Sequence, residues 1–159
     1  MQNKDLEKDF MNMVQLHERI IYKVASFYAD IDQSINDLYQ EVILSLWKAY
    51  PSFRGDSKLS TWIYRIALNT CITFFRRNKR KPTYVDLVID IPDTPDNNEE
   101  IVELYRLVNQ LGKIERALVL LYLDEKSYKE IAEITGLTVT NVSTKISRIK
   151  EKLKKMSNE

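Results

Sequence analysis

Residues 127–154 read SYKEIAEITGLTVTNVSTKISRIKEKLK, and their pattern predicts two helices joined by a tight turn. Ser127 and Glu130 have the spacing of a capping box at the start of the first helix. Gly136 supplies the turn, and Thr138 is placed to cap a second helix that runs to about residue 156. The segment therefore predicts a helix-turn-helix.

The second of these helices has two chemically different faces. One stripe is apolar and is expected to face the core: Val142, Ile146, Ile149 and Leu153. The opposite face and its flank carry hydrogen-bonding and cationic groups, namely Thr140, Asn141, Thr144, Lys145, Ser147 and Arg148. Such groups suit base edges and phosphates in a DNA major groove, an interpretation that we favour over an amphipathic helix that only faces solvent.

The rest of the chain also has a helical pattern. Only 3 Gly and 4 Pro occur in 159 residues, and apolar residues recur at helical spacing. Further helices are expected over residues 5–29, 35–50, about 60–80, 100–111 and 113–124. The expected fold class is therefore all-α, with the helix-turn-helix inside a C-terminal unit of four helices.

Residues 82–99 interrupt this pattern. They contain three of the four prolines, and the stretch from 82 to 105 holds 7 acidic and no basic side chains. Proline removes backbone donors and like charges extend a chain, so we interpret residues 82–99 as an acidic linker. The linker would join two small helical domains, residues 1–81 and 100–159.

The formal net charge is only +1, but the charge is unevenly distributed. Residues 76–81 carry 5 basic and no acidic side chains, and residues 138–159 carry 6 basic and 2 acidic ones, which indicates contact with nucleic acid in two places. A single Cys, a single His and 3 Gly argue against a metal site, a bound cofactor and catalysis by the chain itself. Because no apolar run reaches about 18 residues and the N-terminus is charged, we expect a cytoplasmic protein without a membrane segment.

The helix expected near residues 60–80 carries a second candidate surface. Opposite its apolar arc, six side chains fall within about 80° of one another: Lys58, Trp62, Arg65, Asn69, Thr73 and Arg76. An indole that stacks on an unpaired base, among cations that meet phosphates, suits single-stranded DNA. From spacing alone, an indole in the core beside a solvated charged face is an equally good interpretation.

With both helical blocks described, the chain resembles bacterial RNA polymerase sigma factors of the extracytoplasmic-function (ECF) type. Residues 37–47, DLYQEVILSLW, look like the family's D-L-x-Q-E segment that ends in Trp. Residues 53–57, FRGDS, followed by residues 61–69, TWIYRIALN, are similar to its most specific signature. Residues 123–132, LDEKSYKEIA, look like the start of its region 4. The resemblance implies that residues 1–81 are region 2 and residues 100–159 are region 4.

The resemblance also implies roles for matched positions. Region 2 would dock on the coiled coil of the largest polymerase subunit through Asp37, Gln40 and Glu41. The −10 promoter element would be bound by Phe53, Arg54, Lys58, Trp62, Arg65, Asn69 and Arg76, which favours DNA for the second surface. The −35 element would be read by Thr140, Asn141, Thr144, Lys145, Ser147 and Arg148.

The partners that the resemblance implies are core RNA polymerase, at its largest-subunit coiled coil and its flap, promoter DNA, and an anti-sigma factor. The family commonly has Arg or Lys at the position of Ser143, and Ser147 replaces a larger side chain of some members, so the −35 sequence cannot be borrowed from a relative. Two other classes stay open: a stand-alone regulator that binds duplex DNA as a dimer through residues 127–156, and a helical inhibitor that mimics a sigma domain.

Overall fold

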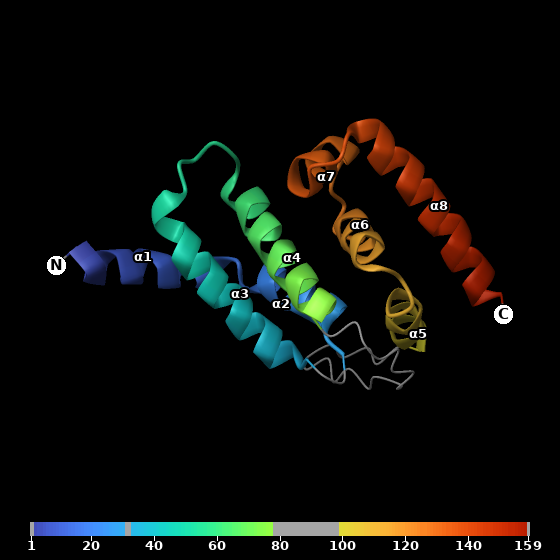
Figure 1. Cartoon of the computed structure of the whole chain (residues 1–159), viewed down its shortest axis with the longest axis horizontal. Coiled ribbons are helices and arrows are strands. Elements are labelled where there is room, and N and C mark those ends of the chain that lie inside the picture. Colours follow the sequence, from blue (N-terminus) through green and yellow to red (C-terminus); the bar gives the residue numbers. More distant parts are fainter. Residues whose placement is uncertain (1, 31–32, 78–98, 159) are drawn as a thin grey trace.

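The computed structural model describes residues 2–30, 33–77 and 99–158, which form eight α-helices and one short 3-10 helix (Figure 1). In chain order they are α1 (Gln2–Leu16), α2 (Glu18–Tyr28), α3 (Ile35–Ala49), η1 (Tyr50–Ser52), α4 (Leu59–Arg77), α5 (Glu99–Val108), α6 (Lys113–Leu123), α7 (Tyr128–Thr135) and α8 (Val139–Ser157). These residues contain no strand, so the all-α prediction is confirmed. The expected acidic linker lies outside the described residues except for Glu99, which opens α5.

The N-terminal unit is built on α2, α3 and α4, whose apolar faces meet in a common core. Its fully buried side chains include Ile21, Val24, Val42, Leu46 and Ile63. Burial of each such side chain stabilises the fold by about 1.5–3 kcal/mol. Phe10 of α1 packs edge-on against Trp47 and Tyr50, with ring centroids 5.0 and 5.4 Å apart, and so ties α1 to the end of α3.

The prediction of a single helix over residues 5–29 is wrong, because the helix breaks at His17. The His17 backbone has φ −120° and ψ 18°, outside the helical region, and its N–H is shared between the Met13 and Val14 carbonyls at 3.2 Å each. The His17 ring also pairs with the Met13 carbonyl, at 2.9 Å. Apolar spacing continues across the break, so periodicity alone did not reveal it.

The C-terminal unit contains the four expected helices, α5 to α8. α6 packs on α7 and α8, and α5 packs on α8. Its most buried side chains include Leu118, Leu120, Leu121, Ile131 and Val142. In the described parts of the chain, no helix could cross a bilayer, and no group of three or more His, Cys, Asp and Glu side chains could hold a metal ion.

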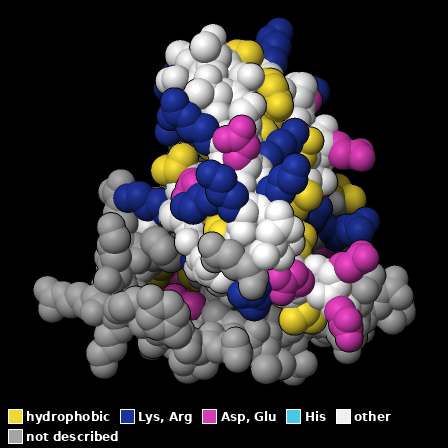
Figure 2. All heavy atoms as spheres, turned by 90° about the vertical axis from the view of Figure 1, so that its right-hand side faces the viewer, with side chains coloured by type: hydrophobic (Ala, Val, Ile, Leu, Met, Phe, Trp, Pro, Cys, Tyr) yellow, Lys and Arg dark blue, Asp and Glu magenta, His cyan; other side chains and the backbone are white. Residues whose placement is uncertain are grey.

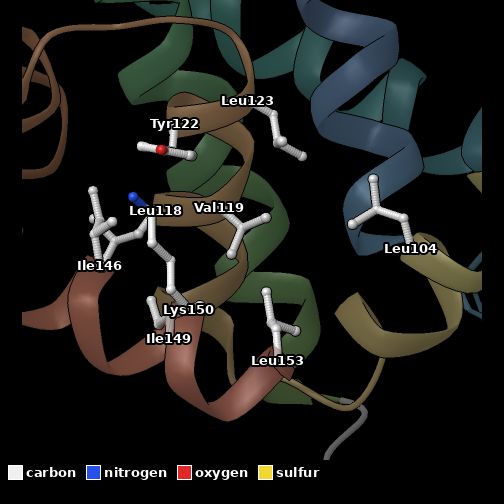
Figure 3. A pocket seen from close by; sticks show the side chains of 9 residues that line it. All are labelled: Leu104, Leu118, Val119, Tyr122, Leu123, Ile146, Ile149, Lys150 and Leu153. Carbon is white, nitrogen blue, oxygen red and sulfur yellow. The ribbon is translucent and has the colours of Figure 1, made fainter. Parts of the chain in front are cut away.

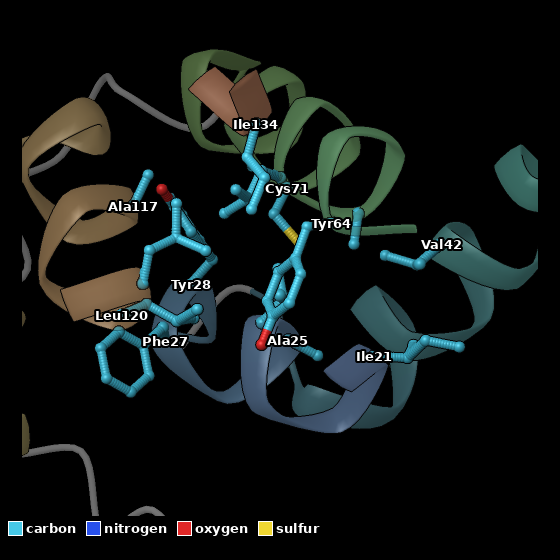
Figure 4. Close-up of a cluster of buried hydrophobic side chains, with 14 of the residues drawn as sticks. Ile21, Ala25, Phe27, Tyr28, Val42, Tyr64, Cys71, Ala117, Leu120 and Ile134 are labelled. Carbon is cyan, nitrogen blue, oxygen red and sulfur yellow. The ribbon is translucent and has the colours of Figure 1, made fainter. Parts of the chain in front are cut away.

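The two units pack directly against each other, an arrangement that the linker pattern did not predict. α6 lies against α2 and α4, and α7 lies against α4, so both units share one continuous core (Figure 1). Figure 4 shows Tyr28 and Tyr64 of the first unit in the same cluster as Ala117, Leu120 and Ile134 of the second. Tyr64 is 0% and Leu120 is 1% exposed, so this seam excludes water as a domain interior does.

The one cysteine gives a direct test of the core. Cys71 on α4 is 1% exposed, as its apolar context predicted, and burial raises the pKa of its thiol to about 12. We expect the native chain at neutral pH to resist iodoacetamide, because almost no thiolate is present or accessible. In concentrated guanidinium, mass spectrometry should show a single added carbamidomethyl group. Rapid labelling of the native chain would contradict the position of Cys71 in the core.

Candidate nucleic-acid interface

The turn between α7 and α8 is built by the capping residues that the sequence indicated. The Ser127 hydroxyl accepts from the Glu130 N–H at 3.1 Å, and the Ser127 N–H donates to the Glu130 carboxylate at 3.3 Å. The Ser127 hydroxyl also donates to the Glu130 carboxylate at 3.1 Å. Donation from the Ser127 N–H first, and from the Ser127 hydroxyl second, holds the pKa of Glu130 below its ordinary value. Gly136 takes a left-handed φ of +81°, and Thr138 caps α8 by accepting from the Asn141 N–H at 3.1 Å. The predicted helix-turn-helix is confirmed.

α8 buries one face and exposes the other. Val142, Ile146 and Ile149 are 0%, 3% and 4% exposed. All six residues expected to contact duplex DNA are exposed: Thr140, Asn141, Thr144, Lys145, Ser147 and Arg148. Figure 2 views the molecule from the α8 side and shows Lys and Arg side chains gathered over its upper half. α8 therefore offers donors, acceptors and positive charge on one surface, and a helix fits the roughly 12 Å width of a major groove.

The residues expected at the −10 element follow α4 and the loop before it. Arg54, Lys58 and Asn69 are exposed, whereas Phe53, Trp62 and Arg65 are half-buried. Arg76 belongs to α4, but its side chain lies outside the described ones.

Trp62 combines features of the two interpretations that its spacing left open. Its ring packs on Phe53, with centroids 4.9 Å apart, and lies 6.3 Å from the centroid of Tyr50. The indole nevertheless keeps part of its surface in solvent, since the residue is only half-buried. Trp62 therefore supports the loop that begins at Phe53 and still presents aromatic surface on the outside of α4.

Arg65 contacts the other unit of the molecule. Its Nε and Nη2 groups donate to the Glu133 carbonyl at 2.8 and 2.5 Å. Glu133 lies in the last turn of α7, where backbone carbonyls have no partner inside the helix. A cation expected to bind DNA therefore lies against the first helix of the helix-turn-helix.

The residues expected to contact polymerase lie on α3. Asp37 and Gln40 are exposed and Glu41 is half-buried, while Leu38, further round the helix, is 1% exposed. The Ser34 hydroxyl caps α3 by accepting from the Asp37 N–H at 3.1 Å. The structure thus presents these three polar side chains on the outer side of a helix whose inner side is fixed in the core.

Asp124 is a seam residue that the sequence analysis missed. Its carboxylate accepts from the Lys23 ammonium at 2.6 Å and from the Tyr64 hydroxyl. Burial alone would raise the pKa of Asp124, but the hydrogen bonds from Lys23 and Tyr64, with the charges of Lys23 and Lys126, hold it below its ordinary value. The signal in the sequence was an acid placed directly after the apolar run at residues 117–123.

Arg116 is a second missed residue, and it is 5% exposed. Its guanidinium donates to the carbonyls of Asn109, Leu111 and Phe27 at 2.7, 3.0 and 3.3 Å. Burial lowers the pKa of Arg116. The clue in the sequence was a cation placed directly before the apolar run at residues 117–123.

An open apolar groove lies on the C-terminal unit between α5, α6 and α8 (Figure 3). Its lining is Leu104, Leu118, Val119, Tyr122, Leu123, Ile146, Ile149, Lys150 and Leu153. Tyr122 and Leu123 are 39% and 48% exposed, which is high for large apolar side chains of one helix. The Lys150 ammonium lies 4.3 Å from the centre of the Tyr122 ring, a cation–π distance. The groove offers apolar surface that residues 2–30, 33–77 and 99–158 leave uncovered.

The two helical units match two known sequence families. The family described as Sigma-70 region 2 matches residues 13–81. The family described as Sigma-70, region 4 matches residues 101–153. The two matches fall in the order that the sequence motifs indicated.

Relatives and solved structures agree with this match. The ECF RNA polymerase sigma-E factor of Escherichia coli K12 is 32% identical over 152 residues, covering 84% of this chain and 80% of that protein. The sigma-E factor of Haemophilus influenzae is 32% identical over 134 residues, covering 74% and 71%.

Two solved structures share the fold at lower identity. The sigma factor RpoE of Bartonella quintana, in complex with the anti-sigma factor NepR, matches with a TM-score of 0.77 and 20% identity over 95% of this chain and 98% of that one. CnrH, in complex with the cytosolic domain of CnrY, matches with a TM-score of 0.70 and 19% identity over 96% and 89%. Two region families in order, relatives along most of the chain and a shared fold lead to one conclusion: the chain belongs to the ECF type of sigma-70 RNA polymerase sigma factors, which direct core polymerase to promoters.

Proposed function

We propose that the two helical units divide promoter recognition between them. Residues 100–159 act as region 4 and read the −35 element as duplex DNA, residues 1–81 act as region 2, and residues 82–99 link them. The observation that supports this most is the exposure of all six polar and cationic residues of α8 opposite a buried stripe. When polymerase carries both units, the second promoter contact becomes intramolecular, so two weak contacts act as one strong contact.

Region 2 binds the −10 element as it melts. The loop residues Phe53, Arg54 and Lys58 hold an unpaired base, Trp62 stacks beside it, and Arg65, Asn69 and Arg76 meet the phosphates and the upstream duplex edge. Exposed Arg54, Lys58 and Asn69 around a half-exposed indole support this assignment. The free energy gained by binding one unpaired base offsets the few kcal/mol that unstacking and unpairing of that base cost.

The chain itself catalyses no reaction and acts in the cytoplasm with the polymerase, which carries out nucleotide transfer. The similarity of the chain to ECF RNA polymerase sigma factors supports this. We also assign the apolar groove between α5, α6 and α8 to the polymerase flap. An anti-sigma factor is a further partner, as the complexes of the two structural neighbours support.

Polymerase docking through α3 is tested by Glu41→Lys. The change reverses a charge on the face formed by Asp37, Gln40 and Glu41, and we expect at least about a tenfold loss of affinity for core polymerase. Helicity should stay unchanged, because Glu41 is not in the core. Co-elution with core polymerase measures the effect. Glu7→Lys makes the same charge change at an exposed site on α1 and serves as the control; if both variants co-elute normally, Glu41 is not in the interface.

Recognition of the −35 element is tested by Arg148→Ala. Loss of a guanidinium that contacts a base should weaken binding by about 1–3 kcal/mol and relax preference at one base position. Lys154→Ala, an exposed position further along α8, is the control and should weaken binding equally for all sequences. Transcription from a library of promoters with varied −35 sequences separates the two effects. An unchanged base preference in Arg148→Ala would remove that residue from base recognition.

A further inference from the structure

α8 begins with an apolar side chain that lies in solvent. Val139 is the first residue of the helix, directly after the cap at Thr138 and the turn that follows α7 (Figure 1), and it is 48% exposed. The other large apolar side chains of α8, from Val142 onward, are buried or half-buried. Because Val139 lies three residues before Val142, the apolar stripe of α8 continues to it and extends beyond the core at this end.

Val139 lies within the surface that we assign to the −35 element. The next two residues, Thr140 and Asn141, are exposed and belong to that surface. Ser143, one turn further along the same side of the helix, is short and half-buried, and it leaves the valine accessible. In a helix-turn-helix the N-terminal residues of the second helix contact base edges in the major groove. Val139 therefore stands at a position that a base edge approaches.

The chemistry of the side chain decides which base edge it suits. Valine has no donor and no acceptor, so it cannot form a hydrogen bond with a base. In the major groove the apolar feature of a base edge is the 5-methyl group of thymine. The other bases would bring a donor or an acceptor against the valine, and that polar group would lose water without gaining a partner. Contact with Val139 therefore favours thymine.

The first turn of α8 holds this side chain in a fixed place. The Val142 N–H donates to the Thr138 carbonyl at 2.9 Å, and the Asn141 N–H donates to the Thr138 hydroxyl at 3.1 Å. A β-branched side chain in a helix also has one strongly preferred rotamer. Val139 therefore loses little conformational entropy when a base methyl group packs against it.

We propose that Val139 is a specificity-determining residue for the −35 element, and that its methyl groups select thymine at one position by contact with the thymine 5-methyl group. The inference rests on the proposed role of α8. It adds to that role a base that is read by apolar contact instead of by hydrogen bonds. Val139 is not among the six residues expected from the sequence, because those were chosen for polar and cationic side chains.

Deoxyuridine tests this contact, because it pairs as thymine does but lacks the 5-methyl group. The probe is a double-stranded promoter fragment with the −35 sequence that the wild-type chain, bound to core polymerase, prefers in the promoter library. Each −35 thymine of either strand is replaced in turn, and affinity is measured by competition with a labelled unsubstituted fragment. We expect one replacement to weaken binding about fourfold, the effect of one methyl group buried against another.

Three variants connect that effect to Val139. Val139→Ala should bind the thymine fragment about fourfold more weakly than wild type, and deoxyuridine at the same position should weaken it no further. Alanine favours helix more than valine does and the site is exposed, so loss of the helix would not explain the result. Val139→Thr keeps the shape and one methyl group, and it should lie between the two. Val102→Ala makes the same change at an exposed site on α5 and should behave as wild type.

The outcomes separate this inference from the proposed function. If Val139→Ala responds to deoxyuridine as wild type does, or if no −35 thymine methyl group affects wild-type binding, the contact is overturned while the −35 role of α8 stands. If the wild-type chain bound to polymerase shows no preference for any −35 sequence, the proposed role of α8 fails, and the inference fails with it.

Discussion

Arg116→Ala is expected to lower the free energy of unfolding by about 3–5 kcal/mol, the largest effect on stability that we predict. The guanidinium is nearly inaccessible and holds three carbonyls, those of Asn109, Leu111 and Phe27. Without it these acceptors lose their partner in a place that water enters with difficulty, and a cavity remains. Because Phe27 lies in region 2 and Arg116 in region 4, the loss acts on the seam as well as on α6. Urea unfolding followed by circular dichroism measures the change.

Two matched variants sharpen this prediction. Arg116→Lys keeps the charge, but one ammonium cannot reach three carbonyls. The free energy of unfolding of this variant should therefore lie between those of wild type and Arg116→Ala. Arg106→Ala removes an arginine from the exposed surface of α5, where it pairs with Glu103 at 2.6 Å. This change should lower the free energy of unfolding much less than Arg116→Ala does. If Arg116→Ala and Arg106→Ala proved equally stable, Arg116 would not be the structural link between α6 and the end of α2.

Trp62→Ala is expected to reduce promoter opening by about 5–150-fold, which corresponds to the 1–3 kcal/mol of one stacked base. The substitution also removes the ring on which Phe53 packs, so the loop before α4 loses its support. Affinity for core polymerase should stay near wild type, because the predicted docking residues lie on α3. Opening is measured with a fluorescent base in the −10 element, and core affinity by co-elution.

Trp62→Phe is the informative control for this effect. Phenylalanine keeps a ring that can stack on a base and on Phe53, so most of the opening activity should return. A parallel loss of core affinity, opening and helicity in Trp62→Ala would show that the indole is a folding residue. Loss of opening alone, with rescue by Trp62→Phe, supports the DNA role.

Local signals in the sequence predicted much of the C-terminal unit. The capping box at Ser127, the left-handed turn at Gly136 and the cap at Thr138 each depend on residues only a few positions apart, so their spacing is visible in the chain itself. The exposed face of α8 follows from the same periodicity. Cys71 was likewise placed correctly in the core by its apolar neighbours.

The break at His17 and the polar contacts of the seam could not be predicted in the same way. At His17 the apolar spacing continues although the backbone leaves the helix, so the pattern hides the change. Arg116 and Asp124 find partners 89 and 101 positions away, in Phe27 and Lys23. Periodicity marks which side of a helix is apolar, but it does not say which other helix will cover that side.

Transcription by core polymerase and the purified chain, on a library of genomic fragments with start sites mapped, tests the division of promoter recognition most directly. We predict discrete start sites that appear only when the chain and the polymerase are both present. Trp62→Ala should lower their yield, and Arg148→Ala should change which fragments are used. A chain that does not associate with core polymerase, yet binds duplex DNA tightly as a dimer, would contradict the assignment of the two units to one promoter.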